Sequence, residues 1–486
     1  MFVRTNVELP VDATSETTLI ELGYKLNDKG QFVKFHTSSS TPSFFEFFVS
    51  DSESRNEENR EKMHEAARNV VMQMLEKLGV RETFLWGEDG AEISDAKPTA
   101  PHVTILTTEL AELKNKKDVV VVIGDHNADA GIWAYRHFLG EGGVDGGSAV
   151  GLVKKLESVG LEGYLAKDFK KYTTDYEARH AFEKDYPTKA VEEEDVPGMI
   201  ILNPGQLLYS PKKNKSMTYA SWRARERPTA LSASYVIDPI SNRVAGHGTA
   251  DEHIDTVLTH VVSNIVGPDA KLYVVCVSDG AERFVKWMDH AFEAEHLNPI
   301  THMTSAVVLM ESTHEHKGIK SSEFVEKLAY LGRSWIKSDQ PKGQLMNTPG
   351  GVKKIHYQSS DEETDDGADS LADSVASLQV DPEASEILTK SIESVDAGVA
   401  GDQPVVVKKS THNKPVKESY DYDAHTVSCP TFSAGIEDYD ELIFPNVVEE
   451  LLAHFRHMAL RSAAEARADG IREENGEGEI QIGYQA

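Results

Sequence analysis

The sequence predicts an α/β fold in which a mainly parallel sheet lies between helices. Short runs of β-branched and aliphatic residues, typical of strands buried on both faces, occur at 119–123, 198–205, 272–277 and 305–310. Segments with a helical spacing of apolar residues lie between these runs. Such alternation is typical of parallel strands joined by helical crossovers.

The helices are predicted from apolar residues that recur every three or four positions. In 57–79, one face of the predicted helix carries Met63, Ala67, Val70, Met74 and Leu78. Further helices are predicted at 148–160, 250–266, 281–295, 321–331 and 447–468. Strand-like segments surround 427–435 and would complete the sheet late in the chain.

Composition narrows the classes of partner. The chain has 486 residues and a formal net charge of -30, a field that repels nucleic acid and anionic membranes. The sequence therefore argues against direct nucleic-acid binding and favours basic protein partners. The two cysteines, Cys276 and Cys429, lie in apolar segments and are expected to be buried thiols. With no signal-peptide core and no apolar run of about 18 residues, we expect a soluble protein of the nucleus or cytoplasm.

The chain is predicted to contain a single domain with an insertion. Residues 1–338 and 413–468 carry the strand and helix patterns, whereas 339–412 is acidic, Ser-rich and poor in large apolar groups. Such a segment cannot bury enough surface to order itself, so we expect a disordered insertion, and also a disordered tail at 469–486. The insertion is interpreted as a solvated spacer, or alternatively as a kinase-regulated docking loop for basic partners.

A serine at the end of a predicted strand raises the possibility of hydrolase chemistry. Ser278 follows the run 272–277 and precedes a helix, which is where serine hydrolases place their nucleophile. Small residues are needed two positions before and after it; Cys276 meets this imperfectly and Gly280 meets it well. Glu311, after the next strand, is in place for the acid of a triad.

The base of such a triad is the missing part. The segment after the last strand, "IEDYDELIF", holds carboxylates and Tyr439 but no histidine, and these groups are poor substitutes for an imidazole. His314 or His316 could act instead, and His425 is a weaker candidate. The alternative is that His314 and His316 are polar residues of a loop without a catalytic role. The catalytic assignment, if the protein is active, is therefore Ser278, Glu311 and His314.

The loop at 124–131, "GDHNADAG", lies where an oxyanion hole would be built, with Gly124, Asp125 and Gly131 as its candidate residues. Asp125 and Asp129 would place negative charge beside a developing oxyanion, which opposes catalysis unless both side chains point away. Neither "HEH" at 314–316 nor the Gly-rich 140–151 has the ligand spacing of a metal site or a phosphate loop. We therefore predict no metal and no cofactor.

One stretch concentrates basic side chains, with the aromatic residues Tyr219 and Trp222 among them. Within 210–228 these are Lys212, Lys213, Lys215, Arg223, Arg225 and Arg227. In isolation the pattern would suggest RNA contact. In so acidic a chain it is interpreted as pairing with acidic neighbours or as a protein-binding surface.

Several segments in a fixed order resemble one family, the Argonaute-binding-protein-2 domain. They include "ELGYKLNDKGQF" (21–32), "GIWAYRHF", "ILNPGQLLYS", "GRSWIKSDQP" and "SCPTFSAGIEDYDEL", and together they cover about 20–338 and 425–456. The resemblance implies an α/β-hydrolase-like three-layer sandwich. It also implies fungal RNA silencing, heterochromatin or deacetylase-associated assemblies, and self-association, for which 447–468 is a candidate surface.

The chain departs from this family in the loop after the last strand, where the family commonly has a histidine. We therefore expect a non-catalytic, hydrolase-like scaffold, a degenerate serine hydrolase that binds Argonaute-type or chromatin and deacetylase proteins as a homo- or heterodimer. The alternative is a serine hydrolase or esterase that uses Ser278. A third possibility is a small-molecule-binding protein that uses the former active-site pocket.

Overall fold

The computed structural model describes residues 18–35, 45–161, 195–225, 235–294, 298–347, 428–436 and 439–474. They belong to one compact unit, Met1–Ile355 with Tyr422–Ala486. Most of the predicted insertion, 348–412, and the end of the predicted tail, 475–486, lie outside the described residues. Residues 339–347, which the sequence assigned to the insertion, are described and include strand β13 (Leu345–Asn347).

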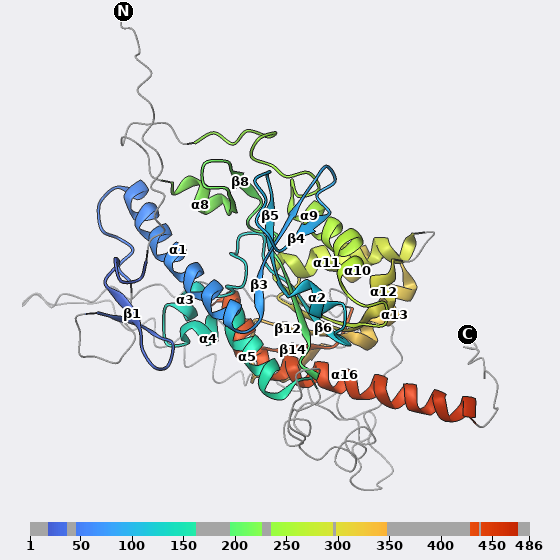
Figure 1. The fold of residues 1–486 in the computed structure, drawn as a ribbon. Helices are drawn as coiled ribbons and strands as arrows, with labels where there is room; N and C mark the ends of the chain where they lie inside the picture. Colours follow the sequence, from blue (N-terminus) through green and yellow to red (C-terminus); the bar gives the residue numbers. More distant parts are fainter. Residues whose placement is uncertain are drawn as a thin grey trace, which may run out of the picture. The chain divides into compact units, whose positions relative to one another are not determined.

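Ten strands of the described residues form one sheet, in the order β13-β14-β12-β11-β10-β6-β7-β5-β3-β4. Figure 1 shows the sheet with helices around it. Besides β13, the strands are β3 (Val80–Trp86), β4 (Glu92–Ser94), β5 (Val103–Thr108), β6 (Asp118–Ile123), β7 (Gly198–Leu202), β10 (Lys271–Val277), β11 (Thr304–Met310), β12 (Gly332–Ile336) and β14 (Thr431–Ser433). All neighbouring pairs from β7 to β14 are parallel. The pairs at the two ends are antiparallel. The predicted α/β class with a mainly parallel sheet is confirmed.

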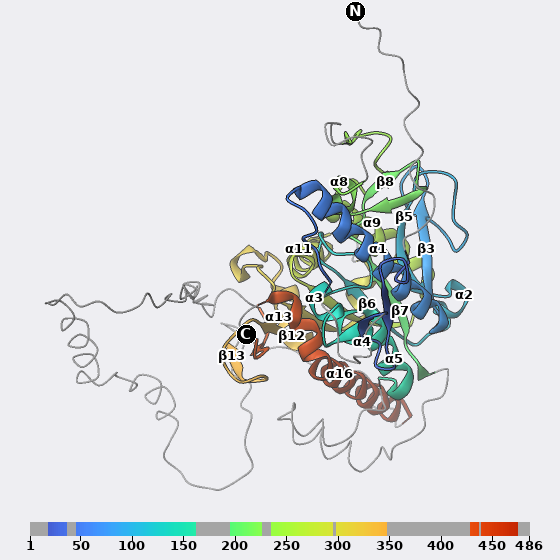
Figure 2. The same ribbon diagram turned by 90° about the vertical axis from the view of Figure 1, so that its left-hand side faces the viewer.

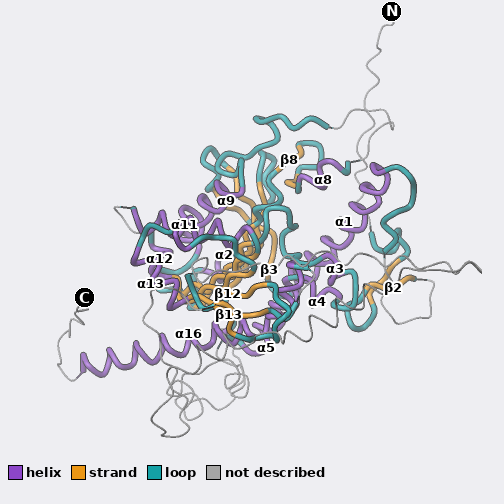
Figure 3. Tube along the Cα trace, turned by 180° about the vertical axis from the view of Figure 1, so that it is seen from behind, coloured by secondary structure: helices purple, strands orange, loops and turns teal. Residues whose placement is uncertain are grey.

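Helices cover both faces of the sheet (Figures 2 and 3). Because side chains alternate along a strand, Val120 and Val122 of β6 pack on one side and Val119 and Val121 on the other. The first face is covered by α1 (Glu53–Lys77), α5 (Ala149–Val159) and α16 (Ile443–Glu474). The second is covered by α9 (Ala250–Thr256), α11 (Asp279–Glu293), α12 (Pro299–Met303) and α13 (Ser322–Leu331). Each central strand of the sheet is therefore buried on both faces, which explains its continuous run of apolar residues.

The predicted helix 250–266 is helical from Ala250 to Ile265 but is not α-helical over its whole length. Between α9 and α10 (Ser263–Ile265) lies a π-helical segment, η2 (Val257–Val262). Its apolar residues are buried as expected, because the wider turn still directs them toward the sheet. The spacing of apolar residues therefore could not reveal the wider turn.

The remaining elements are short and surround the sheet. The hairpin β1 (Tyr24–Leu26)–β2 (Phe32–Lys34) turns at "NDKG", and a second hairpin joins β8 (Leu208–Ser210) to β9 (Lys215–Met217). The short helices are α2 (Leu110–Leu113), α3 (Tyr135–Phe138), α4 (Gly143–Gly147), α8 (Tyr219–Arg223), η3 (His316–Gly318) and η4 (Asp440–Leu442). Within the described ranges, the helices are too short or too polar to cross a bilayer.

Candidate functional site

Ser278 occupies a sharp turn between the carboxyl end of β10 and the first turn of α11. Its backbone has φ 54° and ψ -127°, a left-handed conformation that costs a non-glycine residue about 1–3 kcal/mol. Two backbone hydrogen bonds hold it there. The Ser278 N–H donates to the Met310 carbonyl at 2.8 Å, and the Ser278 carbonyl accepts from Ala281 at 3.0 Å. The side chain is partly exposed, as the nucleophile of a strand–turn–helix elbow would be.

The elbow packs tightly on the loop that follows β6. A Cβ atom on Gly280 would lie 2.5 Å from the Gly124 carbonyl oxygen and 2.9 Å from that of Ile123. Only glycine allows this approach, so the requirement predicted for a small residue at this position has a steric cause. The structure thus brings Gly124 and Asp125 of the predicted oxyanion loop beside the elbow.

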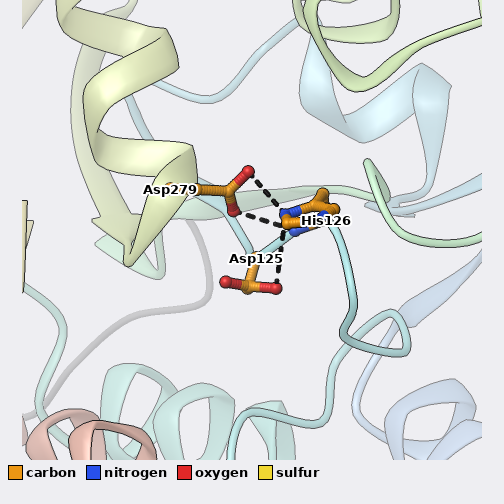
Figure 4. A group of neighbouring side chains, drawn as sticks. All are labelled: Asp125, His126 and Asp279. Atoms are coloured by element: carbon orange, nitrogen blue, oxygen red, sulfur yellow. Dashed lines mark hydrogen bonds and ion pairs between the residues drawn. The ribbon is translucent and has the colours of Figure 1, made fainter. Parts of the chain in front are cut away.

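Asp279, directly after the serine, binds the same loop (Figure 4). Its Oδ2 lies 2.7 Å from His126 Nδ1, and its Oδ1 accepts the His126 backbone N–H at 3.0 Å. Asp125 Oδ1 is 3.7 Å from the same ring nitrogen. One backbone N–H of the loop is therefore already bound to a carboxylate, which reduces the donors left for an oxyanion.

The side chains of Asp125, His126 and Asp279 offer ligand atoms within 4.8 Å of one another, close enough to surround a cation. However, Arg283 Nε also donates to Asp279 Oδ2 at 2.7 Å. Burial raises the pKa of Asp279, but hydrogen bonds from Arg283 and His126 outweigh it and hold that pKa below its usual range. The carboxylate charge is already matched by cationic and polar neighbours, so the group is better explained as an ion-pair cluster.

Asp129, of the same loop, belongs to a buried hydrogen-bond network. Its carboxylate accepts from Arg68 Nη1 at 2.9 Å, from the Tyr135 hydroxyl at 2.7 Å and from Gln206 Nε2 at 2.5 Å. Burial raises the pKa of Asp129, but the Arg68 guanidinium and the Tyr135 hydroxyl more than offset this and lower it. The negative charge of Asp129, which was expected beside a developing oxyanion, is therefore paired with donors inside the protein.

The candidate acid and the last loop are linked by a lysine. Glu311 lies at the end of β11 with φ 47°, and its Oε2 accepts the Lys337 backbone N–H at 2.7 Å. Lys337 Nζ pairs with Asp440 Oδ1 at 2.6 Å, in the loop after β14. Lys337 therefore contacts Glu311 through its backbone and the loop after β14 through its ammonium.

The histidines after Glu311 bind other groups. His314 Nδ1 lies 2.7 Å from the Ser312 hydroxyl, and its Nε2 is buried without a hydrogen-bond partner. Burial, with a smaller effect of His316, lowers the pKa of His314 to about 4. His316 Nδ1 lies 2.9 Å from the Ser428 hydroxyl. His425 lies outside the described residues, as do Glu437 and Asp438.

Taken together, the described residues supply a strained serine, and an acid at the end of the next strand. Across the ranges that the structure describes, no imidazole hydrogen-bonds to the Ser278 hydroxyl. Without a base to take its proton, a serine hydroxyl is a weak nucleophile at neutral pH. Acyl transfer by Ser278 would therefore need a base that the described residues do not bring to its hydroxyl.

The basic stretch folds back on the protein. Lys215 and Lys213 lie 3.1 Å and 3.8 Å from Glu65 Oε1 on α1. The Arg225 guanidinium stacks 3.7 Å from the Trp222 ring. The other predicted partner-binding residues, Lys212 and Arg223, are exposed, and Arg227 lies outside the described residues. The structure thus shows the intramolecular pairing that the sequence offered as one of two interpretations.

Three polar clusters had no sequence pattern to reveal them. Arg68 and Asp129 are 61 residues apart, and Asp279 and His126 are 153 apart. The third cluster is a buried histidine pair, in which His253 Nδ1 lies 2.9 Å from His247 Nδ1.

The family model of the Arb2 domain matches residues 15–342. The chain belongs to the Arb2 domain family. Comparisons with curated proteins and with solved structures gave no match. Residues 15–342 of the chain, which the family model matches, contain the elbow at Ser278, the loop at 124–131 and Glu311. Strand β14 and helix α16 lie beyond the matched residues.

Proposed function

We propose that this Arb2 domain is a non-catalytic, hydrolase-like scaffold that binds protein partners. The observation that carries the proposal is the Ser278 hydroxyl, which lies in a strained elbow without an imidazole bound to it in the described residues. In addition, the candidate acid Glu311 accepts the Lys337 backbone N–H, and the Lys337 ammonium pairs with Asp440. In this proposal, the turn keeps the shape of a nucleophile elbow, and Ser278 has no proton acceptor to activate it.

The hydrolase-like part of the proposal is supported by three features. Ser278 lies between a buried parallel strand and a helix, and Gly280 allows the contact with the loop after β6. The acid follows one strand later, in the chain order of α/β-hydrolases. In the scaffold, these features stabilise the turn and do not perform a reaction.

The proposed partners are Argonaute-type proteins or chromatin and deacetylase complexes, with self-association of the domain. Membership of the Arb2 domain family supports this, together with the net charge of -30, which favours basic protein surfaces. Tagged full-length protein should co-purify with an Argonaute or a histone deacetylase from a native extract. Recovery of neither class, with the tagged protein intact and soluble, would contradict the proposed partners.

A serine hydrolase is the second candidate, and the left-handed backbone of Ser278 favours it. It would require His314 to leave Ser312 and reach the Ser278 hydroxyl, with Glu311 as the acid. Hydrolysis of short-chain p-nitrophenyl esters distinguishes the two. The scaffold predicts equal rates for the wild type and Ser278→Ala, whereas the hydrolase predicts loss of turnover in Ser278→Ala.

A further inference from the structure

A cavity of about 340 Å³, whose lining does not include Ser278, lies between α1, strand β5 and the segment that contains the β8–β9 hairpin and α8. Figure 1 shows where these elements lie in the fold. The size of the cavity falls at the lower end of pockets that hold small ligands, about 300–1,000 Å³. Arg68 and Gln206 line it, and both are fixed by hydrogen bonds to the buried Asp129. The wall formed by these two residues is therefore preorganised.

The lining of this cavity is more basic than the chain as a whole. Six lining residues are cationic, namely Lys62, Arg68, Lys97, Lys213, Lys215 and Arg225. Four lining residues carry a carboxylate, whereas the complete chain has 50 basic and 80 acidic residues. A positive local potential within a strongly acidic protein selects for anions.

The carboxylates of the lining are already engaged. Glu58 pairs with Lys62 at 2.7 Å, and Glu61 pairs with Arg68 at 2.5 Å. Burial raises the pKa of Glu65, but Lys215 and Lys213 outweigh this and lower it, so Glu65 stays charged and paired. Lys97, in contrast, is exposed and has no ion pair with any residue that the structure describes.

Ser216 provides an independent sign of a ligand. It lies on β9, lines the cavity and is 8% exposed, yet its hydroxyl is buried without a hydrogen-bond partner. Buried polar atoms in native proteins almost always have a partner, so each exception calls for a cause. A hydroxyl at the wall of a basic cavity can donate to an anionic oxygen.

We propose that this cavity binds a small organic anion, whose carboxylate or phosphate oxygens accept hydrogen bonds from the Ser216 hydroxyl and the Lys97 ammonium. The site is separate from the Ser278 elbow and does not depend on whether that serine reacts. It also gives the basic stretch a role, because Lys213 and Lys215 of that stretch form part of the wall. The ligand would connect α1 to the β8–β9 hairpin.

Isothermal titration calorimetry of the full chain at constant ionic strength tests this site. The probes are inorganic phosphate and citrate, with glucose as a neutral control. We expect phosphate or citrate to bind with a dissociation constant below about 10 mM, and glucose not to bind. Phosphate alone would assign the ligand a phosphate group, and citrate alone would assign it a carboxylate.

Three variants locate the binding. Lys97→Gln and Ser216→Val should each weaken it by about fivefold or more, the effect of losing one hydrogen bond to an anion. Lys212→Gln is the matched control, because Lys212 is exposed in the same hairpin and does not line the cavity. Binding of neither anion, or an equal loss in Lys212→Gln, would overturn the proposal. Lys97 is at the surface, so its variant stays informative if Ser216→Val fails to fold.

Discussion

The buried carboxylate of Asp129 allows a quantitative test of how the loop after β6 is held. Asp129→Asn removes one negative charge at nearly constant volume. Arg68, whose side chain is 13% exposed, would keep only Glu61 as an acidic partner. An amide also has one acceptor oxygen in place of two, while Tyr135 and Gln206 still present their donors.

The expected cost follows from this geometry. Breaking a buried ion pair by removing one partner costs about 3–5 kcal/mol. Because Glu61 remains 2.5 Å from Arg68, we expect a loss near the lower limit, about 3 kcal/mol. Asp125→Asn is the control: its partly exposed carboxylate is 3.7 Å from His126, so its loss should stay below about 1 kcal/mol.

Urea unfolding followed by tryptophan fluorescence measures both variants. The pKa of Asp129 is lower in the folded than in the unfolded chain, so its stabilising effect is present above the unfolded pKa, about 4, and is lost as the pH falls further. The difference between wild type and Asp129→Asn should therefore stay constant down to about pH 4 and shrink below it. A loss no larger than that of Asp125→Asn would refute the reasoning.

Three other predictions concern the elbow and the histidine pair. Gly280→Ala should destabilise the fold by about 1–3 kcal/mol, because the new Cβ would meet the Gly124 carbonyl oxygen. Gly318 has open space around it, so Gly318→Ala should change the stability by less than about 0.5 kcal/mol. Thermal unfolding of the two variants measures the difference. Ser278→Gly should be about 1 kcal/mol more stable than Ser278→Ala, since glycine tolerates the positive φ, and equal stabilities would contradict the strain. Burial lowers the pKa of His253, so its contribution is full above about pH 6.5 and falls as the pH drops below that value. His253→Gln should flatten the decline in stability below pH 6.5 and the exposed His290→Gln should not; parallel curves for all three proteins would contradict this.

The sequence predicts the centre of the sheet better than its ends, for a physical reason. Strands β6, β7, β10 and β11 are buried on both faces, so nearly every position is apolar and the run is visible. Strand β3 contains Arg81 and Glu82, so it forms no such run, and β14, with three residues, was predicted only as part of the strand-like segments around 427–435. Their place in the sheet depends on long-range pairing, which no local pattern encodes.

The same distinction applies to the candidate site. The elbow at Ser278 is local, since strand, turn and helix follow one another in the sequence. The partners of its neighbours are not local: Asp279 binds His126, and Lys337 binds Asp440 across the segment between β12 and β14. Which side chain stands beside Glu311 could therefore be established only from the fold.

The most direct test of the non-catalytic scaffold is labelling with a fluorophosphonate probe, which reacts only with an activated serine. We expect wild type and Ser278→Ala to show the same background labelling, because the described residues bring no imidazole to the Ser278 hydroxyl. Labelling of the wild type that disappears in Ser278→Ala would show that a base reaches this serine and would contradict the account.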